Sequence, residues 1–125
     1  MNIGLIADDA KKILMQNFCI AYRGLLNRHT LHATGTTGRL IEEVTNLRIH
    51  KYQSGRLGGL QQLGARIGQN DMDAIIFLKD PSAPKVQKPD IGDVICLCNT
   101  YNIPLATNVA TAEILILSLS RGDLD

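Results

Sequence analysis

The run Ala74-Ile75-Ile76-Phe77-Leu78 contains five consecutive apolar residues between Asp73 and Lys79. Polar residues do not alternate with the apolar ones, so a strand formed here would be buried on both faces. Parallel sheets that are covered by helices on both faces give their strands this character. We therefore expect 74–78 to form a strand near the middle of a parallel sheet.

Strand-like and helix-like segments alternate along the rest of the chain. Runs typical of strands lie at 3–7, 30–33, 48–52 and 105–107, and amphipathic segments typical of helices follow Asp9 and lie at 39–44, 60–67, 90–102 and 110–120. This alternation indicates βα units, and no linker or repeat divides it. For 1–125 we expect one α/β domain, with a doubly wound, five-stranded, mainly parallel sheet and helices on both faces.

The charges are nearly balanced, with 13 Lys and Arg against 12 Asp and Glu, and they are scattered along the chain. Such a surface favours neither nucleic acid nor membrane lipid as a partner, so an anion would have to be captured locally. No apolar run is long enough to span a membrane, and Asp8 and Asp9 interrupt the first run before it could form a signal peptide. We expect a soluble protein in the cytoplasm.

The three cysteines, Cys19, Cys96 and Cys98, lie in apolar stretches and form no Cys-x-x-Cys pair. No second cluster completes a zinc site. We expect three buried thiols in a reducing compartment, and no metal.

Open parallel sheets bind ligands in the crevice at the carboxyl ends of their strands. In this chain, the loops at those ends concentrate glycine, hydroxyl and carboxylate residues; they are 8–9, 34–38, 54–59, 80–89 and 107–108. We expect the functional site at this edge.

The segment Thr34-Gly35-Thr36-Thr37-Gly38 is the best candidate for binding an anion. Its two glycines let backbone N–H groups turn towards a phosphate, its three threonines add hydroxyl donors, and a helix N-terminus follows directly. The same residues also fit a threonine-rich turn whose hydroxyls only cap the next helix. Spacing alone does not distinguish phosphate binding from capping.

Charged residues follow the first expected strand. Lys12 stands one helical turn after Asp8, within reach of an anion at the sheet edge, although a solvated surface lysine is the alternative. Asp8 and Asp9 lie where a carboxylate can cap the first helix, and we expect one of them to do so.

Four stretches of the sequence occur in a characteristic order and spacing. The segment Ala33-Thr34-Gly35-Thr36-Thr37-Gly38 resembles the phosphate loop of the methylglyoxal synthases, and Ser54-Gly55-x-x-Gly58-Gly59-x-Gln61-Gln62-x-Gly64-Ala65 continues the similarity in register. Asp80-Pro81 and Pro104-Leu105-Ala106-Thr107-Asn108 extend it. The resemblance to this family therefore covers nearly the whole chain.

The resemblance implies a doubly wound fold, a homohexamer, and an enzyme that converts dihydroxyacetone phosphate to methylglyoxal and inorganic phosphate without a metal or other cofactor. That reaction requires a carboxylate that removes a proton next to the carbonyl, donors that stabilise the enediolate, and a clamp for the phosphate. The residues at the phosphate clamp positions match the family: Lys12, Thr34, Thr36, Thr37, Ser54 and Gly55.

Three polar positions of the reaction centre depart from the family pattern. Leu60 follows Gly58-Gly59 where the family has the aspartate thought to act as the base. Asp8 replaces a histidine after the first strand, and Gln87 replaces the histidine of a later loop. Leucine cannot accept a proton, and the loss of a positioned base lowers rates by roughly 10² to 10⁴.

Two carboxylates of the family pattern, Asp9 and Asp90, are retained, and Asp80 also lines the expected site. Our first hypothesis is a protein that binds phosphate or a triose phosphate, has lost or greatly reduced synthase activity, and serves a regulatory role. The alternative is an active methylglyoxal synthase that uses Asp9 or Asp90 as the base. A third hypothesis is a subunit that acts by assembling with catalytic paralogues.

Overall fold

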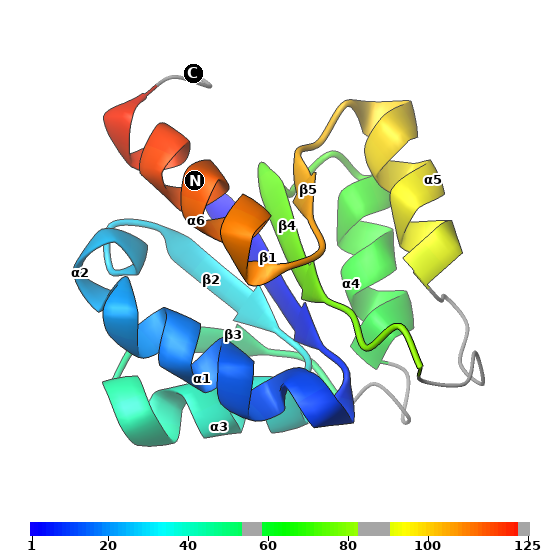
Figure 1. The fold of residues 1–125 in the computed structure, drawn as a ribbon. Coiled ribbons are helices and arrows are strands. Elements are labelled where there is room, and N and C mark those ends of the chain that lie inside the picture. The colour runs from blue at the N-terminus through cyan, green and yellow to red at the C-terminus, as the bar shows by residue number, and fades with distance from the viewer. Residues whose placement is uncertain (54–58, 83–90, 123–125) are drawn as a thin grey trace.

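The computed structural model describes residues 1–53, 59–82 and 91–122, without the side chains of Leu60 and Ile91 (Figure 1). The elements follow one another as β1 (Asn2–Ala7), the 3-10 helix η1 (Asp9–Lys11), α1 (Lys12–Ala21), α2 (Arg23–Leu26), β2 (Thr30–Ala33), α3 (Gly35–Thr45), β3 (Ile49–Lys51), α4 (Gly59–Gly68), β4 (Ala74–Leu78), α5 (Ile91–Tyr101), β5 (Leu105–Ala106) and α6 (Val109–Arg121).

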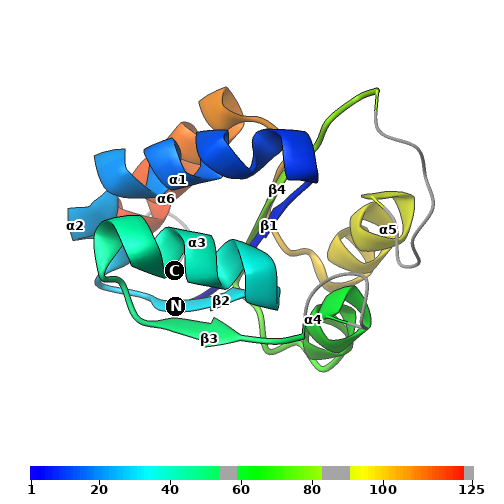
Figure 2. The same ribbon diagram turned by 90° about the horizontal axis from the view of Figure 1, so that it is seen from below.

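The five strands form one sheet in the order β3-β2-β1-β4-β5, and every pairing is parallel. Helices α1, α3 and α6 cover one face, while α4 and α5 cover the other (Figure 2). The expected fold class is thus confirmed. β4 is buried along its whole length between β1 and β5, and β1 occupies the centre of the sheet.

The two faces of β1 pack into two separate clusters of the core. Ile3, Leu5 and Ala7 belong to the cluster that includes side chains of α1, α3 and α6, whereas Ile6 belongs to the cluster that includes Leu63 and other side chains of α4 and α5. This two-sided burial explains why the strand sequences are apolar without alternation. None of the described helices combines the length and apolar character that crossing a bilayer requires.

Helix α3 begins earlier than the sequence predicts, at Gly35 instead of residue 39. The glycines and threonines of its first turn have low helix propensity, but packing against β3 outweighs that preference. A Cβ at Gly38 would lie only 2.6 Å from Cγ of Lys51, so glycine permits the close approach of α3 to β3. Thr34 is consequently the N-cap residue, and 34–38 is the first helical turn and not a separate loop.

The cysteines correct a second expectation. Cys19 and Cys98 are buried as expected, and burial raises the pKa of Cys19 to about 12 and that of Cys98 to about 11. Cys96 is exposed, because it lies on the solvent-facing side of α5. Helix α6 ends at Gly122, which adopts the left-handed conformation with φ of 79°.

Gly4 makes room for tight packing at the centre of the sheet. A Cβ there would lie 2.7 Å from Cδ1 of Ile75 on the neighbouring strand β4, and 3.6 Å from Cδ1 of Leu63 on α4. Both neighbours are fully buried, so neither has solvent space into which to move.

We expect Gly4→Ala to lower the free energy of unfolding by about 1–3 kcal/mol, the usual effect of overpacking a core. Urea denaturation measures it as a shift of the transition midpoint. Gly24→Ala is the matched control, because a Cβ at Gly24 meets nothing within 4 Å, and we expect no destabilisation there. Equal midpoints for Gly4→Ala and the unmodified protein would contradict this account of α4 packing.

Candidate functional site

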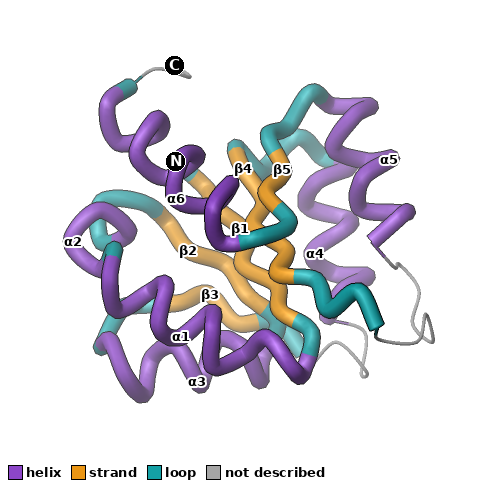
Figure 3. Tube along the Cα trace, in the orientation of Figure 1, coloured by secondary structure: helices purple, strands orange, loops and turns teal. Residues whose placement is uncertain are grey.

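The carboxyl ends of three adjacent strands bring the expected site residues to one edge of the sheet. β2, β1 and β4 are neighbours in the sheet, and they are followed directly by Thr34, Asp8 and Lys79. Figure 3 shows the connecting segments leaving this edge of the sheet. Neighbouring strands lie about 4.8 Å apart, so the ends of β2 and β4 are separated by roughly 10 Å, with the end of β1 between them.

The threonine turn is buried at this edge. Thr34 and Thr37 have 5% and 1% of their surface exposed, and Thr34 Oγ1 donates to Thr37 Oγ1 over 3.4 Å. Thr34 makes no side-chain capping hydrogen bond, in contrast to Asn108, whose Oδ1 accepts from Thr111 N at the start of α6. The N-terminus of a helix attracts anions through its N–H groups and dipole.

The ammonium of Lys12 lies at the end of β1. Its Nζ donates to the carbonyl oxygen of Ala7 over 2.9 Å and is 3.1 Å from Oδ1 of Asp9. The Lys12 side chain is only 18% exposed. Lys12 is therefore not the solvated surface lysine of the alternative interpretation, and its charge is held one strand away from the threonine turn.

Asp8 does not cap the helix that follows it, contrary to our expectation for one of the two aspartates. It occupies the N-cap position of η1 without a side-chain capping bond. Instead, its Oδ2 accepts from the backbone N of Asp80 over 2.8 Å and from Nζ of Lys79 over 3.0 Å. Asp8 thus joins the end of β1 to the end of β4, a contact between residues too far apart in sequence for any local pattern to predict.

Two other carboxylates of the expected site also have partners. The carboxylate of Asp9 is 79% exposed and forms the ion pair with Lys12. Asp80 Oδ1 accepts from the hydroxyl and the backbone N of Ser82, and these two hydrogen bonds lower the pKa of Asp80. Among the described residues, no group of three or more His, Cys, Asp or Glu side chains is arranged to hold a metal ion.

Part of the expected site lies outside the described residues. This holds for Ser54, Gly55, Gln87 and Asp90. Leu60 is the second residue of α4, and its side chain also lies outside the described part of the structure.

Comparison with known proteins identifies the family. The model of the MGS-like domain matches residues 15–107. The methylglyoxal synthase of Caldicellulosiruptor saccharolyticus is 56% identical over 99% of this chain and 88% of its own length, and that of Listeria welshimeri is 56% identical over 100% of this chain and 93% of its own. The crystal structure of methylglyoxal synthase from Elizabethkingia anophelis NUHP1 has a TM-score of 0.86 at 40% identity, covering 92% of this chain and 76% of that one.

The chain belongs to the methylglyoxal synthase family. Our first hypothesis, a phosphate-binding protein with lost or greatly reduced synthase activity, is contradicted by these relatives, because proteins more than half identical over the full chain are named methylglyoxal synthase. The expectation that the protein is not an active enzyme was wrong for the same reason. It gave too much weight to the three changed positions, Leu60, Asp8 and Gln87.

In this member of the methylglyoxal synthase family, β2 carries a polar network that the sequence did not reveal. His32 on β2 is 3% exposed, with Nδ1 3.1 Å from Tyr52 Oη and Nε2 3.1 Å from Asn2 Oδ1. Because an amide oxygen only accepts, Nε2 carries a proton and donates to Asn2 Oδ1. Burial lowers the pKa of His32 to about 4, so near neutral pH the imidazole is neutral and Nδ1 accepts from the tyrosine hydroxyl.

The next residue after Tyr52 ties β3 to two helices. Gln53 O accepts from the backbone N of Gly35 over 3.1 Å, and Gln53 N donates to Oε1 of Gln62 over 3.0 Å. Gln53 directly precedes Ser54, one of the residues expected to bind phosphate. The hydrogen bonds of Tyr52 and Gln53 thus fix the last residues before 54–58.

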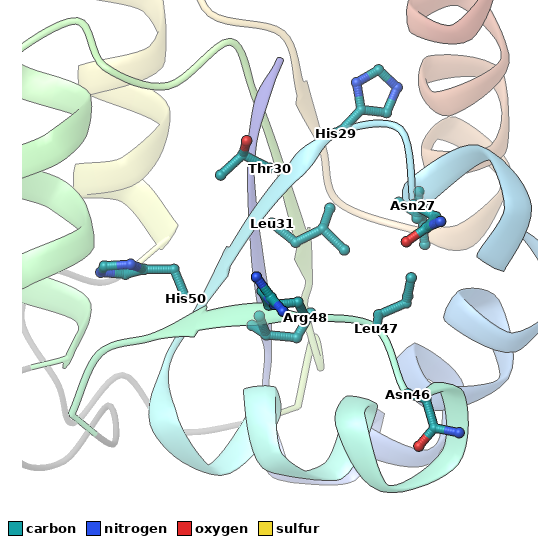
Figure 4. Close-up of a pocket in the computed structure, with 10 residues that line it drawn as sticks. Asn27, His29, Thr30, Leu31, Asn46, Leu47, Arg48 and His50 are labelled. Atoms are coloured by element: carbon teal, nitrogen blue, oxygen red, sulfur yellow. The ribbon is translucent and has the colours of Figure 1, made fainter.

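A separate cavity of about 710 Å³ lies at the opposite edge of the sheet, at the amino ends of β2 and β3 (Figure 4). Leu31 and Leu47 line its interior, while His29, Asn46 and His50 lie at separate margins. These polar side chains do not converge on one point. The cavity is therefore distinct from the candidate site at the carboxyl edge.

His32 predicts a pH dependence of stability. Burial above all, with smaller contributions from the charges of His50 and Arg66, lowers its pKa from 6.5 to about 4, although Asp71 acts in the opposite direction. Between these values the unfolded chain binds a proton at His32 that the folded chain does not, so the free energy of unfolding falls as the pH drops from 6.5 to about 4. We expect this contribution to reach roughly 3 kcal/mol.

Urea denaturation at a series of pH values, compared between the unmodified protein and His32→Phe, measures this contribution as a difference in slope. His50→Gln serves as the control, because it removes the exposed neighbouring imidazole and should keep most of the slope. An NMR titration that places the pKa of folded His32 near 6.5 would refute the prediction.

Proposed function

We propose that this protein is a methylglyoxal synthase that converts dihydroxyacetone phosphate to methylglyoxal and inorganic phosphate. The observation that supports it most strongly is the placement of a buried threonine turn, at the N-terminus of α3, beside the Lys12 ammonium at the end of β1. The names of relatives that match the whole chain support the same activity.

The geometry of the edge suits a substrate of this length. A phosphate bound at the N-terminus of α3 would lie above the end of β2. The distance from phosphorus to the far carbon is close to one strand spacing of about 4.8 Å, so the carbons would reach the end of β1, beside β4. The reacting carbons would therefore lie near the residues that follow β1 and β4, which are Asp8, Asp9 and Lys79.

The reaction needs one proton acceptor. A carboxylate removes a proton from the hydroxymethyl carbon, and the electron pair forms an enediolate with the charge on the former carbonyl oxygen. A proton then moves from the hydroxyl oxygen of the enediolate to the former carbonyl oxygen. The alkoxide left behind forms the aldehyde carbonyl, the carbon–carbon double bond shifts, and phosphate leaves from the far carbon. The resulting enol takes up a proton on that carbon and loses its hydroxyl proton to give methylglyoxal. Backbone N–H groups and hydroxyls at the α3 N-terminus stabilise the phosphate as it leaves.

Between the two candidates for the base, we propose Asp90. Asp9 is 79% exposed, and its Oδ1 is paired with Lys12 Nζ. A general base acts in direct contact with the substrate, and exclusion of water strengthens the interactions around it. In this arrangement Asp9 orients Lys12, while Asp90, the other carboxylate retained from the family pattern, accepts the proton.

The phosphate clamp is tested by Thr37→Val, which removes a hydroxyl without changing the side-chain shape. We expect the affinity for inorganic phosphate, measured by calorimetry, to fall roughly 10- to 100-fold, because a hydrogen bond to a charged group contributes about 1.5–3 kcal/mol. Methylglyoxal formation should fall with it. Thr100→Val is the control, because its hydroxyl donates to Cys96 O on exposed α5. Unmodified protein that forms no methylglyoxal above background would reject the proposed function.

The identity of the base is tested by Asp90→Asn and Asp9→Asn. We expect Asp90→Asn to lower kcat by roughly 10² to 10⁴ while the affinity for inorganic phosphate changes little. Asp9→Asn should mainly raise KM, because it releases Lys12 from its ion pair. Full turnover by Asp90→Asn, together with loss of turnover in Asp9→Asn, would assign the base to Asp9 instead.

A further inference from the structure

Asp8 and Lys79 lie side by side at the middle of the carboxyl edge. β1 and β4 pair with Ala7 opposite Leu78, so the next residue on each strand continues the register. Asp8 N donates to Leu78 O over 3.1 Å, and Lys79 N donates to Thr107 O over 3.4 Å. The backbone therefore fixes both residues before their side chains meet.

The side chains form a partly buried ion pair. Lys79 Nζ is 3.0 Å from Asp8 Oδ2, and the two side chains are 21% and 24% exposed. The same oxygen accepts from Asp80 N over 2.8 Å, which holds the carboxylate in place. Since an ammonium has three N–H donors, the bond to Asp8 uses one and leaves two that can be directed elsewhere.

The pair also changes the charge of the site. A carboxylate at Asp8 would by itself repel a phosphate, but the adjacent ammonium offsets it. Lys11 and Lys12 add positive charge from the following turn, and Asp9 and Asp80 add negative charge. Each of these two carboxylates has its own partner, Lys12 for Asp9 and Ser82 for Asp80.

We propose that Lys79, oriented by Asp8, is a catalytic residue that donates a hydrogen bond to the substrate carbonyl oxygen. The inference rests on the proposed synthase function, and it assigns to Lys79 the stabilisation of the enediolate. When the C–H bond breaks, the proton passes to the base and the electron pair forms the carbon–carbon double bond. The carbonyl oxygen then carries the negative charge, and the Lys79 ammonium stabilises that charge without transferring its own proton.

The placement of Lys79 supports this role over that of a purely structural link. Its ammonium lies at the boundary of β1 and β4, where the carbons of a substrate whose phosphate is bound at α3 would lie. Partly exposed ion pairs contribute little to the free energy of folding. Stabilisation of the contact between β1 and β4 therefore does not by itself explain the pair of Asp8 and Lys79. A fixed positive charge beside a developing oxyanion, by contrast, lowers the barrier because it needs no reorganisation.

The test compares two ligands, inorganic phosphate and 2-phosphoglycolate, which carries a carboxylate where the enediolate oxygen would lie. We expect the unmodified protein to prefer 2-phosphoglycolate. Lys79→Met should weaken 2-phosphoglycolate binding roughly 10- to 100-fold and leave phosphate affinity within about threefold, because only one charged hydrogen bond is lost. It should also lower kcat more than it changes KM, and Lys79→Arg should restore part of the loss.

Lys11→Met is the matched control, because it removes another positive charge near Asp80 that has no ion pair with Asp8. Asp8→Asn keeps an acceptor for Asp80 N but loosens the ammonium, so it should reduce the preference for 2-phosphoglycolate by less than Lys79→Met does. It also tests the proposal if Lys79→Met fails to fold.

Three results would overturn the role of Lys79: no preference for 2-phosphoglycolate in the unmodified protein, a preference unchanged in Lys79→Met or Asp8→Asn, or an equal loss in Lys11→Met. A lower melting temperature with an unchanged preference would identify the pair as structural. Failure of the synthase function is a separate result, since it would show as no methylglyoxal formed by the unmodified protein while the binding comparison still reports on Lys79.

Discussion

The register of β1 with its two neighbours determines which side chains meet at the functional edge. Leu5 lies opposite Ala33 on β2, and Ala7 lies opposite Leu78 on β4. A slip of one residue would turn every side chain of β1 to the other face and move its apolar residues into the wrong core cluster. The burial of Ile3 and Leu5 on one side and Ile6 on the other therefore also fixes the positions of Asp8 and Lys79.

Charge at this edge is distributed in pairs. Asp8 is joined to Lys79 and Asp9 to Lys12, so two potential sources of repulsion for a phosphate are offset by adjacent ammonium groups. Pairs with this degree of exposure contribute little to the free energy of folding, and their main effect is to orient side chains. In the proposed function, the phosphate would be held by directed donors at the N-terminus of α3, and these donors do not depend on a net positive surface.

Periodicity predicted the fold well, because it follows from local rules. The apolar run 74–78 and the alternation around it were sufficient for a five-stranded parallel sheet. The start of α3 was missed because contact between Gly38 and β3 outweighs the low helix propensity of the first turn. Contacts between residues far apart in sequence, such as Asp8 with Lys79 or His32 with Tyr52, produce no periodic pattern in the sequence. They could therefore be identified only from the structure.

The carboxylates of the edge differ in how well each could serve as the base, and their partners account for the difference. Oδ2 of Asp8 already accepts hydrogen bonds from the Lys79 ammonium and from the backbone N–H of Asp80, so it is not available to the substrate. The hydrogen bonds from Ser82 lower the pKa of Asp80 and make it a weaker proton acceptor. Asp9 is exposed and orients Lys12. None of these three described carboxylates is well suited to act as the base, which is why the proposed function assigns that role to Asp90; a leucine at position 60 is compatible with turnover if that assignment holds.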